Sequence, residues 1–147
     1  MIFCLAISTI ICALPCFAAL GGDVSTVRDD QARIHATWNV TQRSGYAVHE
    51  LRGADGRIVR EYASSSGKIF AIAWYGPWAP DLQHLLGAHF EEFQQALQAQ
   101  RRGAGHGPVV VQLPGLVVDL GGHMRSFAGR AYLPDELPDG VRAEEIR

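Results

Sequence analysis

A histidine and an arginine lie close together near the end of the chain, in a segment rich in glycine and aromatic residues. Within residues 121–134, His123 is followed two positions later by Arg125. Histidine changes its charge near neutral pH and arginine orients anions, so this pair is suited to acid–base chemistry with electrostatic support. One functional hypothesis is therefore a small hydrolase or lyase with His123 and Arg125 in its site.

The same segment also has a purely structural interpretation. Gly121 and Gly122 predict a backbone turn, and the residues after them predict a strand that ends at Pro134. Along such a strand Arg125 and Arg130 point to opposite faces, so they cannot clamp one anion unless a β-bulge intervenes, for which Gly129 is the candidate position. The chain also lacks the common hydrolase and metalloprotease motifs, which leaves catalysis unsupported.

A second group of chemically distinctive residues consists of aromatic rings beside two prolines. Trp74, Tyr75 and Trp78 flank Pro77 and precede Pro80. Rings in this arrangement are suited to a binding lip for a peptide or a small apolar ligand. The alternative is that they close one end of the hydrophobic core.

The histidines do not predict a metal site. His84 and His89 are five residues apart in a predicted helix, about 140° around its axis, so they cannot chelate one ion. Asp81 and His84 share a face of the helix, but the sequence offers no third metal ligand beside them. Asp81 is instead interpreted as a helix cap and His84 as a surface residue. The sequence therefore predicts neither a metal nor a cofactor.

Size and charge limit the class of protein. A chain of 147 residues is expected to form one domain, and 13 basic against 15 acidic side chains give a net charge of −2. No basic block is present, so the composition disfavours nucleic acid as a partner.

The first residues have the pattern of an export signal. Residues 2–14 are apolar apart from a Ser-Thr pair, and small residues precede a cleavage position near Ala18. All three cysteines lie within residues 1–18, so the mature domain is expected to be cysteine-free and periplasmic or secreted. The alternative is an uncleaved anchor, in which case this segment is the only membrane contact.

Periodicity predicts a sheet and a long helix. Residues 81–101 keep apolar side chains at helical spacing, and residues 23–36 predict a shorter helix. Strands are predicted near residues 37–44, 46–52, 57–62, 68–75, 109–113, 116–120 and 123–134. The fold class is therefore α+β, a mainly antiparallel sheet with one long amphipathic helix packed across it. The predicted organisation is a signal peptide at 1–18, a single domain at 19–134 and a peripheral C-terminal tail at 135–147.

Three segments carry a resemblance to a known family. Residues 66–74, 80–87 and 122–134, together with the start of the mature chain at 19–22, resemble an uncharacterised exported bacterial family, domain of unknown function 2844. The resemblance implies export and a single domain, and it implies no activity, cofactor or catalytic residue.

These observations favour a non-catalytic binding or assembly module of the periplasm or envelope. Its expected partner is an envelope protein or a small ligand, and the candidate binding residues are Trp74, Tyr75, Trp78, His123 and Arg125.

Overall fold

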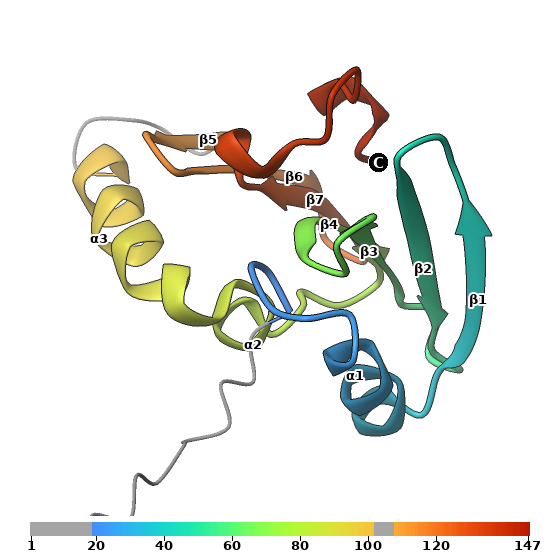
Figure 1. The fold of residues 1–147 in the computed structure, drawn as a ribbon. Helices are drawn as coiled ribbons and strands as arrows, with labels where there is room; N and C mark the ends of the chain where they lie inside the picture. The colour runs from blue at the N-terminus through green and yellow to red at the C-terminus, as the bar shows by residue number, and fades with distance from the viewer. Residues whose placement is uncertain (1–18, 102–107) are drawn as a thin grey trace, which may run out of the picture.

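The computed structural model describes residues 19–101 and 108–147. The proposed signal peptide, residues 1–18, lies outside the described residues. Seven strands form one antiparallel sheet in the order β1-β2-β3-β4-β7-β6-β5, with helices on one face (Figure 1). The strands are β1 (Thr37–Gln42), β2 (Tyr46–Arg52), β3 (Ile58–Ser64), β4 (Ile69–Gly76), β5 (Val109–Leu113), β6 (Leu116–His123) and β7 (Ser126–Tyr132). The predicted α+β class is confirmed.

The central strand is β4, which is apolar on both faces. It lies between β3 and β7, and all its residues except Tyr75 are buried. The short N-terminal segment pairs with the first residue of β4, because Gly21 N–H donates to the Ile69 carbonyl (2.8 Å) and Ile69 N–H donates to the Gly22 carbonyl (2.9 Å). Ala19 and Leu20 are buried beside it, so the described chain belongs to the domain from its first residue.

The helical layer covers one face of the sheet. It consists of α1 (Thr26–Ile34), α2 (Leu82–Leu86), the 3-10 turn η1 (Gly87–His89) and α3 (Phe90–Arg101). The predicted helix at 81–101 therefore exists but is broken at Gly87, whose φ of 51° a continuous α-helix does not permit. Leu85, Leu86 and Phe93 bury its apolar stripe against the sheet. No helix among the described residues is long and apolar enough to cross a membrane.

The C-terminal segment covers part of the opposite face, here called the open face (Figure 1). It contains the 3-10 turns η2 (Pro134–Glu136) and η3 (Ala143–Glu145). The sequence suggested a peripheral tail, yet Ile146 is only 1% exposed and packs with Phe70, Ala71 and Ala73 of β4. The reason is that β4 presents apolar side chains to both faces, and the open face needs its own cover.

The final hairpin differs from its predicted form. Gly121 and Gly122 pair with Ala128 and Phe127 inside the β6–β7 ladder, so they do not form the turn. The turn lies at Met124 and Arg125, where Arg125 adopts a φ of 65°. The register through Gly129 is continuous on both sides, and no bulge occurs there.

Candidate functional site

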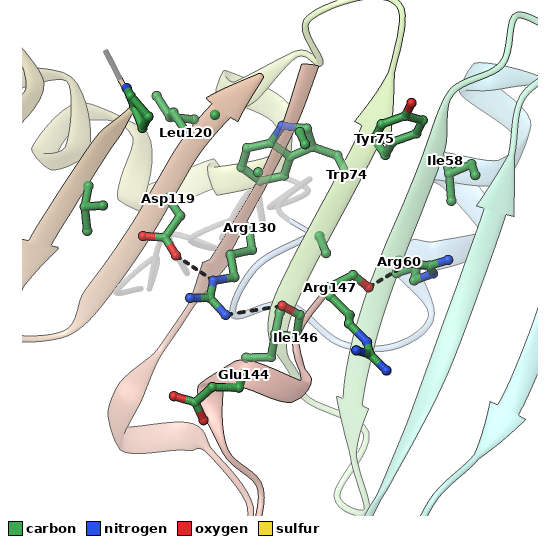
Figure 2. A pocket seen from close by; sticks show the side chains of 16 residues that line it. Ile58, Arg60, Trp74, Tyr75, Asp119, Leu120, Arg130, Glu144, Ile146 and Arg147 are labelled. Atoms are coloured by element: carbon green, nitrogen blue, oxygen red, sulfur yellow. Dashed lines mark hydrogen bonds and ion pairs between the residues drawn. The ribbon is translucent and has the colours of Figure 1, made fainter. Parts of the chain in front are cut away.

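An apolar hollow lies on the open face, over β4, β7 and β6. It is a groove of about 650 Å³ (Figure 2). Strand register places Tyr75 beside Ala128 and Ala128 beside Gly121, and it places Ala73 beside Arg130. Because paired residues share a face of the sheet, Ala73, Ala128 and Gly121 form a floor of small residues. The groove exists because these three positions carry almost no side chain.

Larger side chains rise around this floor. Tyr75, which is 54% exposed, and Ile58 stand on one side, and Val110 of the edge strand β5 stands on the other. Glu144, Ile146 and Arg147 of the C-terminal segment close one end (Figure 2). The lining is thus aliphatic and aromatic with a charged rim, a composition typical of small-molecule sites.

Two arginines of the sheet fasten the C-terminal segment at this rim. Arg130 Nε donates to Asp119 Oδ2 (2.6 Å), while its Nη1 donates to the carbonyls of Ala143 (2.6 Å) and Ile146 (3.4 Å). Arg60 Nη1 donates to the main-chain oxygen of Arg147 (2.7 Å). These hydrogen bonds therefore hold the segment through its main chain.

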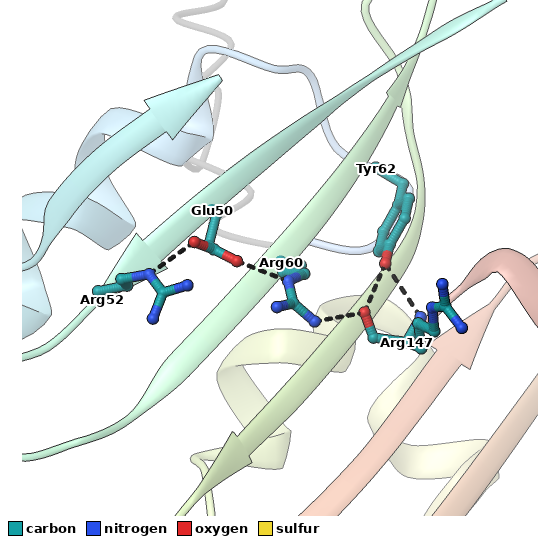
Figure 3. Close-up of polar contacts among 5 residues, drawn as sticks. All are labelled: Glu50, Arg52, Arg60, Tyr62 and Arg147. Atoms are coloured by element: carbon teal, nitrogen blue, oxygen red, sulfur yellow. Dashed lines mark hydrogen bonds and ion pairs between the residues drawn. The ribbon is translucent and has the colours of Figure 1, made fainter. Parts of the chain in front are cut away.

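Around Arg60 the contacts form a connected network (Figure 3). Tyr62 donates its hydroxyl to the Arg147 main-chain oxygen (2.9 Å) and accepts from the Arg147 N–H (3.0 Å). Partial burial alone would raise the pKa of Glu50, but hydrogen bonds from Arg60 and Arg52 lower it below its ordinary value. Glu50 stays ionised and holds the Arg60 guanidinium toward the segment.

A second depression lies on the other side of the C-terminal segment, over β1 to β3. It has a similar volume, about 660 Å³, but polar and charged side chains line it, among them Asn39, Thr41, Arg43, Glu145 and Arg147. The segment therefore divides the open face into an apolar groove and a polar one.

The three aromatic candidates lie in different surroundings. Tyr75 and Trp74 are both among the residues that line the apolar groove, but Trp74 is only 6% exposed and belongs to the core cluster on the helical side. Its ring crosses Gly129 of β7, where an added Cβ would lie 2.4 Å from Trp74 Cζ2. Trp78 is 62% exposed and lies outside the groove lining.

His123 and Arg125 lie at the tip of the β6–β7 hairpin. Both are exposed, and neither lines the apolar or the polar groove described above. His123 Nδ1 lies 3.2 Å from the Met124 carbonyl, and among the described residues no hydrogen bond joins His123 or Arg125 to another side chain. The hairpin brings no second catalytic group to them.

Sequence reasoning missed the rim residues Arg60, Asp119 and Arg130. The available signal was the β6–β7 hairpin itself, because its register sets Asp119 opposite Arg130. Their role at the groove depends on the position of the C-terminal segment, which periodicity does not predict.

A buried polar cluster between the sheet and the helices was also missed. Asp30 of α1 and Glu61 of β3 are both buried, and His84 Nε2 of α2 contacts Asp30 Oδ1. Asp81, predicted as a helix cap, does accept a hydrogen bond from the His84 N–H (3.1 Å). Within residues 19–101 and 108–147, no group of three or more His, Cys, Asp or Glu side chains is arranged to hold a metal ion.

Together these features define a small α+β domain whose open antiparallel sheet carries an apolar groove beside a bound C-terminal segment. The chain belongs to a family described as a protein of unknown function (DUF2844), whose profile matches residues 16–146. The resemblance to domain of unknown function 2844 is thus confirmed. No curated protein and no solved structure matches the chain.

Proposed function

We propose that this protein is a non-catalytic binding module of the periplasm or envelope, and that its apolar groove takes a small, mainly apolar molecule with one anionic group. The observation that carries the proposal is the groove itself, a hollow of about 650 Å³ floored by Ala73, Ala128 and Gly121. Small-molecule sites typically occupy roughly 300–1,000 Å³ and combine an apolar lining with a few polar groups. At the rim, Arg60 and Arg130 already bind carboxylates and the main chain of the C-terminal segment, so Arg147 is the residue that favours an anionic group.

Export of the protein is part of this proposal. The segment directly after the cleavage position proposed near Ala18 is buried at Ala19 and Leu20. Its hydrogen bonds to β4 and to the Leu85 carbonyl support a mature domain that includes this segment. Cleavage at this position would remove only residues that precede the described fold.

The hydrolase or lyase hypothesis receives less support than binding. At the exposed hairpin tip, His123 is the one side chain suited to proton transfer, and Arg125 beside it stays charged. The tip therefore lacks, among the described residues, a hydrogen-bonded side chain that would orient His123 for catalysis.

A groove-filling variant tests the proposal. Gly121 lies in the floor, has no positive φ, and an added Cβ there would meet only the Ala128 carbonyl, at 3.8 Å. Gly121→Phe should therefore fold normally and fill the groove, weakening binding of the dye anilinonaphthalene sulfonate (ANS) by about tenfold or more, which is roughly 1.4 kcal/mol. Fluorescence titration measures this affinity.

The matched control is Gly115→Phe, in the β5–β6 turn, where an added Cβ meets nothing within 4 Å and no groove is near. It should bind ANS as the unmodified protein does. Equal affinity of all three proteins, or no ANS binding by the unmodified one, would refute the groove as the binding site.

A second candidate is docking of an envelope protein, favoured by the exposed indole of Trp78 and by Met124, which is 85% exposed. In that case Trp78→Ser would abolish capture of the partner from a periplasmic extract while ANS affinity stays unchanged. Loss of ANS binding in Trp78→Ser would instead place Trp78 in the ligand site.

A further inference from the structure

Glu61 is an ionisable side chain that is buried at the centre of the sheet. It lies in β3, paired with His49 of β2 and Ile72 of β4, and it faces the helical layer with 0% exposure. Neither of its carboxyl oxygens has a hydrogen-bond partner if the group is ionised. A buried carboxylate without a hydrogen-bond partner strongly destabilises the folded state. The Glu61 side chain must therefore be protonated or be hydrogen-bonded to a neighbouring group.

Asp30 of α1 supplies the neighbour. Its carboxyl group is within hydrogen-bonding reach of Glu61, it is 3% exposed, and its Oδ2 also lacks another partner. Two buried carboxylates in contact repel each other, whereas one proton between them lets the protonated group donate to the ionised one. A single proton thus satisfies both groups.

We propose that Asp30 and Glu61 form a proton-binding site: they hold one proton between them, and this proton joins α1 to the sheet. The protein then packs its N-terminal helix most firmly when the pair is singly protonated. Loss of the proton sets two negative charges against each other beneath α1 and weakens that packing.

The surrounding charges are arranged to keep one carboxylate ionised and the other protonated. From α1 itself, Arg33 Nη2 lies 3.5 Å from Asp30 Oδ1. From α2, His84 contacts the same oxygen, and Asp81 turns toward Arg33, with 3.6 Å between Oδ2 and Nη1. The Arg33 and His84 contacts both fall on Asp30 Oδ1, so the neighbouring hydrogen-bond donors converge on Asp30 and not on Glu61.

On the sheet side the neighbour of Glu61 is neutral. Burial lowers the pKa of His49, which accepts a hydrogen bond at Nδ1 from Trp38 Nε1 (3.2 Å). Burial, followed by the charge and hydrogen bond of Asp30, raises the pKa of Glu61 from its ordinary 4.5 to about 8, although Arg33 acts in the opposite direction. Glu61 is therefore the protonated partner.

The pH dependence follows from this raised pKa. Between the ordinary value of 4.5 and about 8, the folded protein holds a proton that the unfolded chain has released. The stabilisation by this proton is fully present below 4.5 and is lost as the pH rises toward 8. Across this range the unfolding equilibrium constant should rise by up to about tenfold per pH unit.

The test is urea unfolding of the purified protein across this pH range, with hydrogen exchange of the α1 amides as a local readout. The unmodified protein should lose stability as the pH rises, and its α1 amides should exchange faster than expected from the pH change alone. Glu61→Gln retains a hydrogen-bond donor toward Asp30 and should remove most of this pH dependence. Glu91→Gln, at an exposed position of α3, should leave it intact.

Infrared spectroscopy of the unmodified protein provides a readout that requires no variant to fold. The carbonyl band of a protonated carboxylic acid should be present near neutral pH and disappear as the pH rises past about 8. Absence of that band near neutral pH, or an unchanged pH dependence of stability in Glu61→Gln, would overturn the proposal.

Discussion

Replacing Gly129 by alanine is expected to destabilise the domain by about 3 kcal/mol or more. Gly129 lies in β7 between β4 and β6, and Trp74 lies across it. An alanine Cβ would lie 2.4 Å from Trp74 Cζ2 and 2.6 Å from the Asp119 carbonyl oxygen. The second contact is with the backbone of the neighbouring strand, so rotating the indole away does not relieve the overlap. Urea unfolding measures the loss.

Gly121→Ala is the matched control, because it makes the same change in the neighbouring strand where the nearest atom lies 3.8 Å away. It should change the free energy of unfolding by no more than about 1 kcal/mol. Equal stability of Gly129→Ala and the unmodified protein would show that Trp74 does not occupy the space over Gly129.

Replacing Ile146 by alanine is expected to release the C-terminal segment from the open face without unfolding the sheet. The Ile146 side chain is almost fully buried against β4, and truncating such a residue typically costs about 2–5 kcal/mol. The lost packing energy affects mainly the C-terminal segment, because its other contacts with the sheet are the hydrogen bonds of Arg60, Arg130 and Tyr62. Hydrogen exchange of the Arg147 amide, which donates to Tyr62, should accelerate at least about tenfold.

Glu144→Ala removes an exposed side chain of the same segment and should leave this exchange unchanged. An equal acceleration in both variants would mean that the buried Ile146 side chain does not anchor the segment. Because the segment forms one end of the groove, Ile146→Ala should also weaken ANS binding, while Glu144→Ala should have a smaller effect.

Much of the architecture could be predicted from periodicity and turn residues. The β2–β3 hairpin follows from two short strand patterns around Gly53–Gly56, and β4 follows from apolar residues on both faces. The final turn was misplaced because glycine pairs resemble turns, whereas strand pairing extends the hairpin to Met124 and Arg125. The energy gained by continuing the ladder outweighs the cost of the positive φ at Arg125.

The groove was less predictable than the fold. Its floor depends on three small residues from three strands, Ala73, Ala128 and Gly121, which become neighbours only once the strand order and register are known. Tyr75 was nominated from the aromatic cluster and does line the groove, but nothing local distinguished it from the buried Trp74 or from Trp78. Glu61 was missed because it lies in an otherwise ordinary strand pattern, and its partner Asp30 is distant in sequence.

The central claim is that the open-face groove is the ligand site, and NMR mapping of isotope-labelled protein during an ANS titration tests it most directly. The predicted result is a set of amide shifts concentrated at Ala73, Tyr75, Gly121 and Ala128, absent in Gly121→Phe and retained in Gly115→Phe. Shifts concentrated at His123 and Arg125 on the hairpin tip, or on the helical face, would contradict it.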